Sequence, residues 1–160
     1  MQIRPATEAD WPAILAIVKP VLAAGETYAI DRDLDDAGVH AYWMMPAHEV
    51  CVAEIDGQIV GTYYLMHNQR GGGAHVANCG YMTSPAAQGR GVARAMCEHS
   101  LRRARERGFR AMQFNHVVST NTRAVTLWQQ LGFDIVGTLP RAFHHPVHGY
   151  VDSFVMFRSL

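Results

Sequence analysis

Apolar positions along the chain change their spacing several times, and each spacing predicts an element. Between residues 11 and 22 the apolar side chains recur every three or four positions, which is typical of one face of a helix. Thr7 and Asp10 form a capping pair at its expected start, from about residue 7. Residues 50–55 and 58–66 are rich in strand-forming side chains and flank Asp56-Gly57, a typical hairpin turn. The pattern predicts a helix followed by an antiparallel pair of strands.

The remainder of the chain alternates between strand-like and helix-like segments. Further strands are predicted at residues 2–5, 75–83, 110–117, 133–139 and 150–157, and further helices at 33–45, 91–108 and 122–131. Gly108 is expected to end the long helix. Residues 68–73 and 140–150 are expected to form irregular loops. The order predicts a single domain over residues 1–160 of the α/β (α+β) class, a mixed and mostly antiparallel sheet with helices on both faces.

Composition narrows the classes of function. Lys and Arg together number 14, as do Asp and Glu, so no strong field draws the chain to nucleic acid or to an anionic membrane. No segment approaches the roughly 18 apolar residues of a membrane span, and no secretory signal pattern opens the chain. The three cysteines show no metal or disulfide spacing, and the histidines at 144, 145 and 148 stand in a predicted loop without fixed geometry. We expect a cytoplasmic protein that binds a small molecule and no metal.

The segment between the predicted strand 75–83 and the helix 91–108 has the features of an anion-binding loop. Its residues are Gln88, Gly89, Arg90, Gly91, Val92, Ala93 and Arg94. The first turn of a helix carries unpaired N–H groups and the positive end of the helix dipole, and glycines let an anion approach them. The segment lacks the Lys-Ser/Thr pair of a P-loop and the three-glycine spacing of dinucleotide-binding proteins. It therefore predicts a site for another kind of diphosphate.

Two segments carry a resemblance to the GCN5-related N-acetyltransferase (GNAT) family. Residues 88–93 resemble its signature Gln/Arg-x-x-Gly-x-Gly/Ala, and residues 121–133 (NTRAVTLWQQLGF) resemble its Asn-x-x-Ala-x-x-Leu-Tyr-x-x-x-Gly-Phe segment. The resemblance extends over nearly the whole chain. It implies the acyl-CoA N-acyltransferase fold and direct transfer of an acetyl group from acetyl-CoA to an amine in a ternary complex. It also implies that residues 88–94 hold the pyrophosphate, and that backbone groups of Tyr81, Met82 and Thr83 contact the pantetheine arm.

The chain departs from the family pattern at Trp128, where the family usually has the tyrosine that serves as general acid. An indole N–H is only a hydrogen-bond donor and cannot release its proton at physiological pH. Either hydrogen bonds alone stabilise the leaving thiolate, or another residue has taken the role, and the general base is equally open. His116 follows Asn115 and, by simple strand alternation, is expected to point to the opposite face, which disfavours it as the base.

Three asparagines are the candidates for the reaction centre: Asn78, Asn115 and Asn121. An uncharged carboxamide can hold an amine and its acetyl acceptor in attack geometry. The segments around them look like the fungal proline-analogue (azetidine-2-carboxylate) N-acetyltransferases, which share the tryptophan. That resemblance implies that Asn78 contacts the substrate, that Asn115 and Asn121 are catalytic amides, and that Asn121 also contacts acetyl-CoA. The alternatives are an N-cap at Asn121, a buried amide at Asn115 and a bend residue at Asn78.

We therefore expect an acetyl-CoA-dependent N-acetyltransferase that acts on a small amine, with an amino or imino acid as the leading substrate. Such a substrate requires a closed pocket, expected between residues 25–34 and 140–150. One alternative is acetylation of a protein N-terminus or lysine, which requires an open channel. Another is a non-catalytic acyl-CoA-binding sensor, since the usual tyrosine is absent. A homodimer is expected because such folds often pair edge strands.

Overall fold

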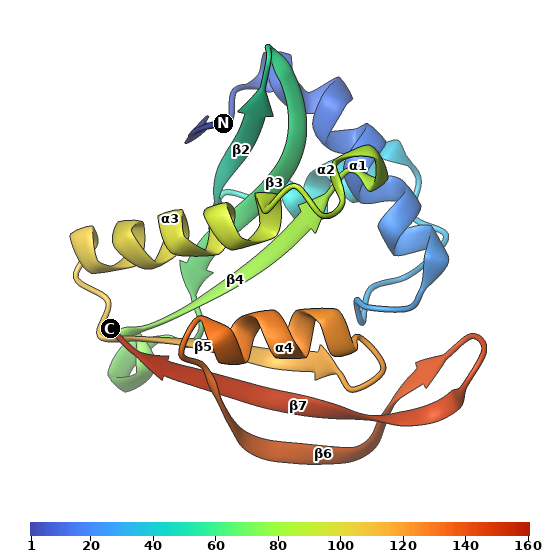
Figure 1. The fold of residues 1–160 in the computed structure, drawn as a ribbon, viewed down its shortest axis with the longest axis vertical. Helices are drawn as coiled ribbons and strands as arrows, with labels where there is room; N and C mark the ends of the chain where they lie inside the picture. The colour runs from blue at the N-terminus through green and yellow to red at the C-terminus, as the bar shows by residue number, and fades with distance from the viewer.

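The computed structural model describes all residues from 1 to 160 and contains one seven-stranded sheet (Figure 1). The strands are β1 (Gln2–Pro5), β2 (Glu49–Ile55), β3 (Gln58–His67), β4 (Val76–Thr83), β5 (Ala111–Val118), β6 (Asp134–His145) and β7 (Gly149–Ser159). The α-helices are α1 (Trp11–Ala24), α2 (Asp36–Trp43), α3 (Val92–Glu106) and α4 (Thr122–Gln130). Three short 3-10 helices are η1 (Glu8–Asp10), η2 (Gly71–Gly73) and η3 (Pro85–Ala87).

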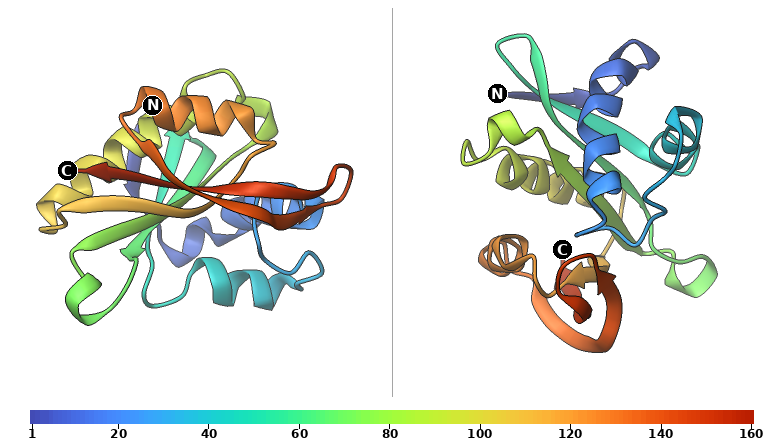
Figure 2. Two further views of the ribbon diagram at one scale, coloured as in Figure 1. Left: turned by 90° about the horizontal axis from the view of Figure 1, so that it is seen from below. Right: turned by 90° about the vertical axis from the view of Figure 1, so that its right-hand side faces the viewer.

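The sheet has the order β1-β2-β3-β4-β5-β7-β6, and every neighbouring pair is antiparallel except β4 and β5. Helices α1 and α2 cover one face, whereas α3 and α4 cover the other (Figure 2). Each layer has its own hydrophobic core, with Trp43 buried on the α1–α2 side and Met96 on the α3–α4 side. The predicted fold class is confirmed, as is the antiparallel hairpin at Asp56-Gly57.

The parallel strands β4 and β5 stay together only at their beginning. The ladder joins Val76 to Ala111 and Ala77 to Met112, and then stops. Beyond this point the two strands diverge, as Figure 1 shows on the side where α3 and α4 begin. Because a sheet strand normally satisfies its backbone groups on both sides, the divergence leaves one side of β4 free over most of its length.

The structure corrects three predictions about local elements. Residues 8–10 form a 3-10 turn before α1, so the α-helix begins at Trp11 and not near residue 7. The second helix is shorter than the predicted 33–45, because Asp35 caps it by accepting the N–H of Gly38. The predicted loop 140–150 lies mostly within β6 and β7, since the buried His145 Nδ1 accepts the N–H groups of the two residues that follow Pro146 and so orders a tight turn.

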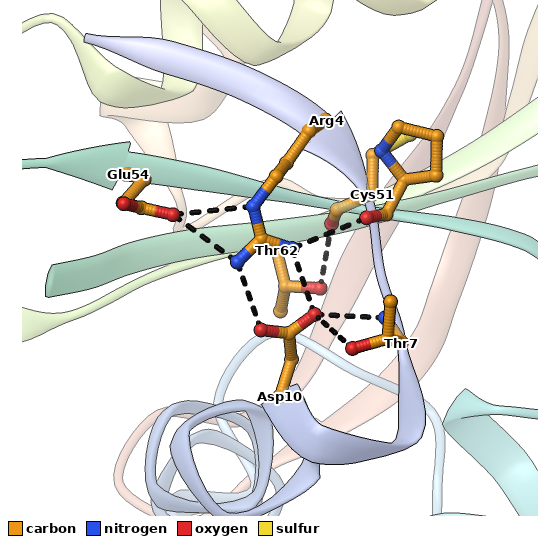
Figure 3. Close-up of polar contacts among 7 residues, drawn as sticks. Arg4, Thr7, Asp10, Cys51, Glu54 and Thr62 are labelled. Atoms are coloured by element: carbon orange, nitrogen blue, oxygen red, sulfur yellow. Dashed lines mark hydrogen bonds and ion pairs between the residues drawn. The ribbon is translucent and has the colours of Figure 1, made fainter. Parts of the chain in front are cut away.

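A closed polar cluster fixes β1 and η1 to the sheet (Figure 3). The Arg4 guanidinium donates to both carboxylate oxygens of Asp10, at 2.8 and 2.9 Å, and to Glu54 on β2 at 3.2 Å. Asp10 also accepts the backbone N–H and the hydroxyl of Thr7 at 2.8 and 3.0 Å, which confirms the predicted capping pair. Hydrogen bonds from the Arg4 guanidinium and from Thr7 hold the pKa of Asp10 well below its usual range, although partial desolvation opposes this shift.

Candidate active site

The glycine loop leads directly into α3 and leaves the first N–H groups of this helix unpaired. Gly89 and Gly91 have φ angles of 77° and 75°, in the left-handed region that favours glycine, and a Cβ at either position would meet no atom within 4 Å. Gly91 is the N-cap of α3 and offers no side chain to it. No backbone acceptor of the chain takes the N–H groups of Val92 and Ala93. These residues fit a diphosphate, because an anion there would cap the helix and meet its positive end.

The free side of β4 carries backbone groups from alternate residues. Ser84 and Val76 exchange backbone hydrogen bonds with β3, so the even-numbered residues of β4 direct their N–H and C=O groups toward β3. The odd-numbered residues Cys79, Tyr81 and Thr83 therefore direct theirs toward β5, from which β4 has diverged. We call these three residues the open edge of β4. The open edge runs toward the glycine loop, so an extended amide-bearing chain could pair with it as a further strand.

One residue of the predicted pantetheine site does not belong to this edge. Met82 pairs with Thr62 in the β3–β4 ladder, so its backbone groups are directed to β3, and its side chain is buried in the α1–α2 core. Tyr81 and Thr83 direct their backbone groups into the gap between the diverging strands β4 and β5. The physical reason is the two-residue period of a strand, which excludes a continuous run of three backbone contacts along one edge.

Carboxamide side chains gather on the α1–α2 face where β4 and β5 begin to diverge. Asn115 is exposed and lies on β5, where its Nδ2 donates to Asn68 Oδ1 at 2.7 Å and its Oδ1 accepts from Gln113 at 2.8 Å. Asn78 lies on the same face, opposite Met66 of β3, and is only half-buried. The structure therefore places Asn78 and Asn115 on one face of neighbouring strands. Sequence reasoning missed Asn68, which it placed in a flexible loop.

Asn121 and Trp128 belong to α4, on the opposite face. The Asn121 side chain accepts the N–H of Ala124 at 3.4 Å, which confirms its expected role as N-cap. The Trp128 ring is 8% exposed and packs against the rings of Tyr81 and Phe114, with centroids 5.1 and 5.3 Å away. Its indole N–H has no hydrogen-bond partner in the chain. Asn121 therefore stands just after β5, at the start of the helix that packs on the α3–α4 face.

The alternation from which the orientation of His116 is predicted does not hold, because a β-bulge interrupts β5. Between Phe114 and Val117 the register against β7 shifts, and both of these side chains enter the α3–α4 core. His116 packs against Phe143, whose ring centroid is 5.9 Å away. Burial lowers the pKa of His116, and a hydrogen bond with the backbone of residue 142 partly offsets this shift. Its Nδ1 is buried and unpartnered. This nitrogen is closed off from solvent, so His116 remains a weak candidate for the base.

Tyr28 reaches the open edge from a distant segment. It lies between α1 and α2, and its hydroxyl donates to the Tyr81 carbonyl oxygen at 2.8 Å. This is the one hydrogen bond that a side chain makes to the backbone of the open edge. Burial, together with the neighbouring Tyr42, raises the pKa of Tyr28 well above its usual range. The sequence placed Tyr28 in a predicted pocket wall, but nothing in the pattern indicates this contact across 53 positions.

Thiol and metal chemistry find no support at this site. All three cysteines are free and buried. Burial raises the pKa of the Cys79 thiol strongly and that of Cys97 to about 12, so neither offers a thiolate nucleophile near neutral pH. No group of three or more His, Cys, Asp and Glu side chains has the geometry to hold a metal ion.

Two hollows lie on the α3–α4 side, and the larger includes Arg94 of the glycine loop. The larger, about 480 Å³, is lined in part by the guanidinium groups of Arg94, Arg105 and Arg158. The smaller, about 310 Å³, lies on α4 and includes Arg123. Gln130 lines both, and its Oε1 accepts a hydrogen bond of 2.5 Å from Arg94. The larger hollow therefore carries three arginines against the single carboxylate of Glu98, and an extended anionic ligand could enter it.

Comparisons with known proteins agree with this arrangement. The family model described as Acetyltransferase (GNAT) family matches residues 11–133. N-acetyltransferase aca1 of Schizosaccharomyces pombe is 32% identical over 113 residues, which are 69% of this chain and 54% of that protein, so the chain spans about half the length of this curated relative. Among solved structures, a GCN5-related N-acetyltransferase from Kribbella flavida is 49% identical with a TM-score of 0.94, covering 99% of this chain and 97% of that one. A ribosomal-protein-alanine N-acetyltransferase from Brucella melitensis is 27% identical with a TM-score of 0.85, covering 100% of both chains.

Proposed function

The chain belongs to the acetyltransferase (GNAT) family, and we propose that it transfers the acetyl group of acetyl-CoA to the amine of a small amino or imino acid. The observation that carries this proposal is the open edge of β4, which leads to the uncapped start of α3. An acyl carrier with a diphosphate at one end and amide groups along its arm matches both features. The family resemblance identifies that carrier as acetyl-CoA.

Each part of acetyl-CoA finds a matching surface. The pyrophosphate is held by the loop of residues 88–94, through the N–H groups at the start of α3 and the side chains of Arg90 and Arg94. The amides of the pantetheine arm pair with Tyr81 and Thr83. The hollow lined by Arg94, Arg105 and Arg158 offers positive charge to the phosphate of CoA that is not part of the pyrophosphate. This leaves the thioester within the gap between β4 and β5.

The chemistry requires an unprotonated amine and a stabilised leaving group. The amine nitrogen attacks the carbonyl carbon of the thioester, the C–N bond forms, and the C–S bond breaks with its electron pair leaving on sulfur. Asn78 and Asn115 lie on the face opposite α3 and α4, so we assign them to the side from which the amine enters. Their carboxamides can orient the amine without adding charge to the site. Asn121, at the start of α4, serves the acetyl-CoA side.

A small substrate is favoured by the way the α1–α2 segment meets the sheet. Tyr28 is hydrogen-bonded to the open edge, so the segment that carries it closes one side of the gap. A peptide or lysine substrate needs a channel that stays open there. The relative from Brucella melitensis has a protein as its named substrate, so acetylation of a protein N-terminus remains the second candidate function.

Release of thiol from acetyl-CoA tests the proposed function. The purified protein is incubated with acetyl-CoA and a panel of imino acids, amino acids, polyamines and N-terminal peptides. We expect amine-dependent release with one of the small imino or amino acids. Release with peptides alone supports the protein acetyltransferase, whereas tight CoA binding without release on any panel member contradicts the enzyme and favours the sensor.

We also propose that two copies of the chain associate through β6. This strand is the edge of the sheet, and three of its apolar side chains are exposed: Ile135 at 38%, Val136 at 59% and Leu139 at 38%. An exposed edge with apolar side chains favours pairing with another strand. Light scattering should give the mass of a dimer at micromolar concentration, and a monomer at that concentration contradicts the proposal.

The cytoplasm is the location that we propose. Three free and buried thiols suit a reducing compartment. None of the helices combines the length and the hydropathy that a bilayer crossing demands.

A further inference from the structure

No tyrosine stands at the family's usual position to stabilise the leaving sulfur. Trp128 stands at the position of the family tyrosine, and its indole N–H, which has no partner in the chain, is one candidate donor although it cannot exchange a proton. The thiols of Cys79 and Cys97 are buried with raised pKa values. His116 has its free nitrogen buried against β6. A second candidate donor, the Tyr28 hydroxyl, lies at the open edge itself.

We infer that the Tyr28 hydroxyl is a hydrogen-bond donor of the reaction centre, which stabilises the negative charge on the sulfur as the C–S bond breaks. This inference rests on the proposed function, because it concerns the same gap. Tyr28 is the one side chain that makes a hydrogen bond to the backbone of the open edge, at the Tyr81 carbonyl oxygen, 2.8 Å away. A residue in contact with the edge that holds the acyl arm is within reach of what that arm carries.

The present hydrogen bond of Tyr28 explains how its proton becomes available. A phenol has a single proton, so a bond to the Tyr81 carbonyl and a bond to sulfur exclude each other. An amide N–H that pairs with the open edge supplies the Tyr81 carbonyl with a new donor. The tyrosine hydroxyl can then rotate about its C–O bond and donate elsewhere in the gap. The Tyr81 carbonyl oxygen is thus the partner of the hydroxyl before the acyl arm binds.

The proton balance needs no further reactant. The Tyr28 hydroxyl donates a hydrogen bond and stays protonated, which agrees with the direction in which burial moves its pKa. The proton that the amine nitrogen loses on becoming an amide passes through solvent to the sulfur, which leaves as a thiol. One preorganised donor of this kind contributes roughly a factor of 10² to 10³ in kcat where the charge develops on oxygen. We expect about 10- to 100-fold here, because sulfur is a weaker acceptor.

The matched control is Tyr42, a neighbouring partly buried tyrosine. Its hydroxyl is 3.3 Å from that of Tyr64 and makes no bond to the open edge. Tyr28→Phe and Tyr42→Phe each remove one phenol oxygen from the same layer of the molecule. Any general loss of packing or of a buried hydrogen bond should therefore affect both variants, whereas a role at the sulfur should affect only the first.

The pKa of the CoA thiol, measured in the complex by ultraviolet absorbance of the thiolate, tests the inference without turnover. A donor to sulfur favours the thiolate, so Tyr28→Phe should raise this pKa by about one unit, which is a tenfold change in the ionisation equilibrium. Tyr42→Phe should leave it unchanged. CoA affinity by calorimetry should stay within threefold in both variants. An unchanged thiol pKa in Tyr28→Phe overturns the inference, as does a shift that appears with Trp128→Phe and not with Tyr28→Phe.

Turnover with the substrate found in the panel gives a second readout. We expect Tyr28→Phe to lower kcat about 10- to 100-fold with KM for acetyl-CoA within threefold, and Tyr42→Phe to retain the wild-type kcat. Equal losses in the two variants, or a loss in Tyr28→Phe that lies in KM and affinity, would make Tyr28 a structural tether. Because the thiol titration needs only CoA, the inference can fail while the acetyltransferase activity stands, and the activity can fail while CoA binds.

Discussion

Two polar regions of this molecule show opposite ways of treating hydrogen-bonding groups. In the cluster at the N-terminal strand, Arg4, Asp10, Glu54 and Thr7 use one another as partners, and the oxygens of Asp10 are all engaged. At the open edge of β4, the backbone groups of alternate residues face a gap, and Tyr28 alone reaches them. The first region satisfies itself and contributes to stability. The second is left incomplete by the fold, and we propose that the acyl carrier completes it.

The same contrast separates the two strand pairs to which β4 belongs. On the β3 side the ladder runs over seven residue pairs, from Gly61 with Thr83 to His67 with Ala77. On the β5 side it ends after two. A strand that is fully paired on one side is held firmly enough to present its other side as a fixed template. The full pairing of β4 with β3 and its unpaired backbone groups toward β5 therefore belong to one proposed binding arrangement.

The largest expected effect is a loss of CoA affinity when a negative charge is placed in the glycine loop. Gly91→Glu places a carboxylate at the N-cap of α3, in the proposed pyrophosphate site, and should lower CoA affinity more than 100-fold by calorimetry. Gly91→Ala is the control, because it carries the strain of a positive φ, roughly 1–2 kcal/mol, without the charge. Both variants should lose thermal stability to a similar extent. Equal CoA affinity in Gly91→Glu and the wild type would remove the pyrophosphate site from this loop.

A smaller effect is expected where the carboxamides meet the gap. Asn115→Ala should lower kcat by about tenfold to a thousandfold, because it removes the amide that we propose aligns the amine. Gln113→Ala removes one hydrogen bond to Asn115 but leaves its amide and the bond to Asn68, so its loss should stay below tenfold. If Asn115→Ala keeps a normal kcat and raises only the KM for the amine, Asn115 is a binding residue and not a catalytic one.

The smallest effect on activity is expected in the closed cluster. Asp10→Asn should lower the melting temperature by several degrees at pH 7 and leave CoA affinity unchanged. Because the folded state lowers the pKa of Asp10, its contribution is present above the unfolded value of about 3.9 and is lost as the pH falls through the lower folded value. The difference in stability between wild type and variant should therefore shrink below about pH 4. A constant difference down to pH 2 would contradict the charge-based origin.

Much of the fold and part of the site follow from local sequence patterns. The glycine loop, the N-cap at Asn121 and the hairpin at Asp56-Gly57 each depend on residues within a few positions of one another, and the structure confirms the cap and the hairpin. His116 shows the limit, since a bulge in the pairing of β5 with β7 breaks the alternation from which the orientation of its side chain is predicted.

The remaining parts of the site depend on contacts between distant segments. The hydrogen bond between Asn115 and Asn68 spans 47 positions, and that between Tyr28 and the Tyr81 carbonyl spans 53. No periodicity encodes either of them. Which backbone groups of β4 stay free is likewise decided by register with β3 and by divergence from β5, so a run of three pantetheine contacts was predicted where the pleat allows only alternate ones.

Residue-resolved amide hydrogen exchange along β4, with and without CoA, tests the central claim most directly. The open edge predicts that the N–H groups of Tyr81 and Thr83 exchange readily in the free protein and become protected when CoA binds. The N–H groups of Gly80 and Met82, which face β3, should be protected in both states. Protection that alternates along the strand in this way is the expected result. Protection that rises uniformly along β4, or that does not change at Tyr81 and Thr83, would contradict the account.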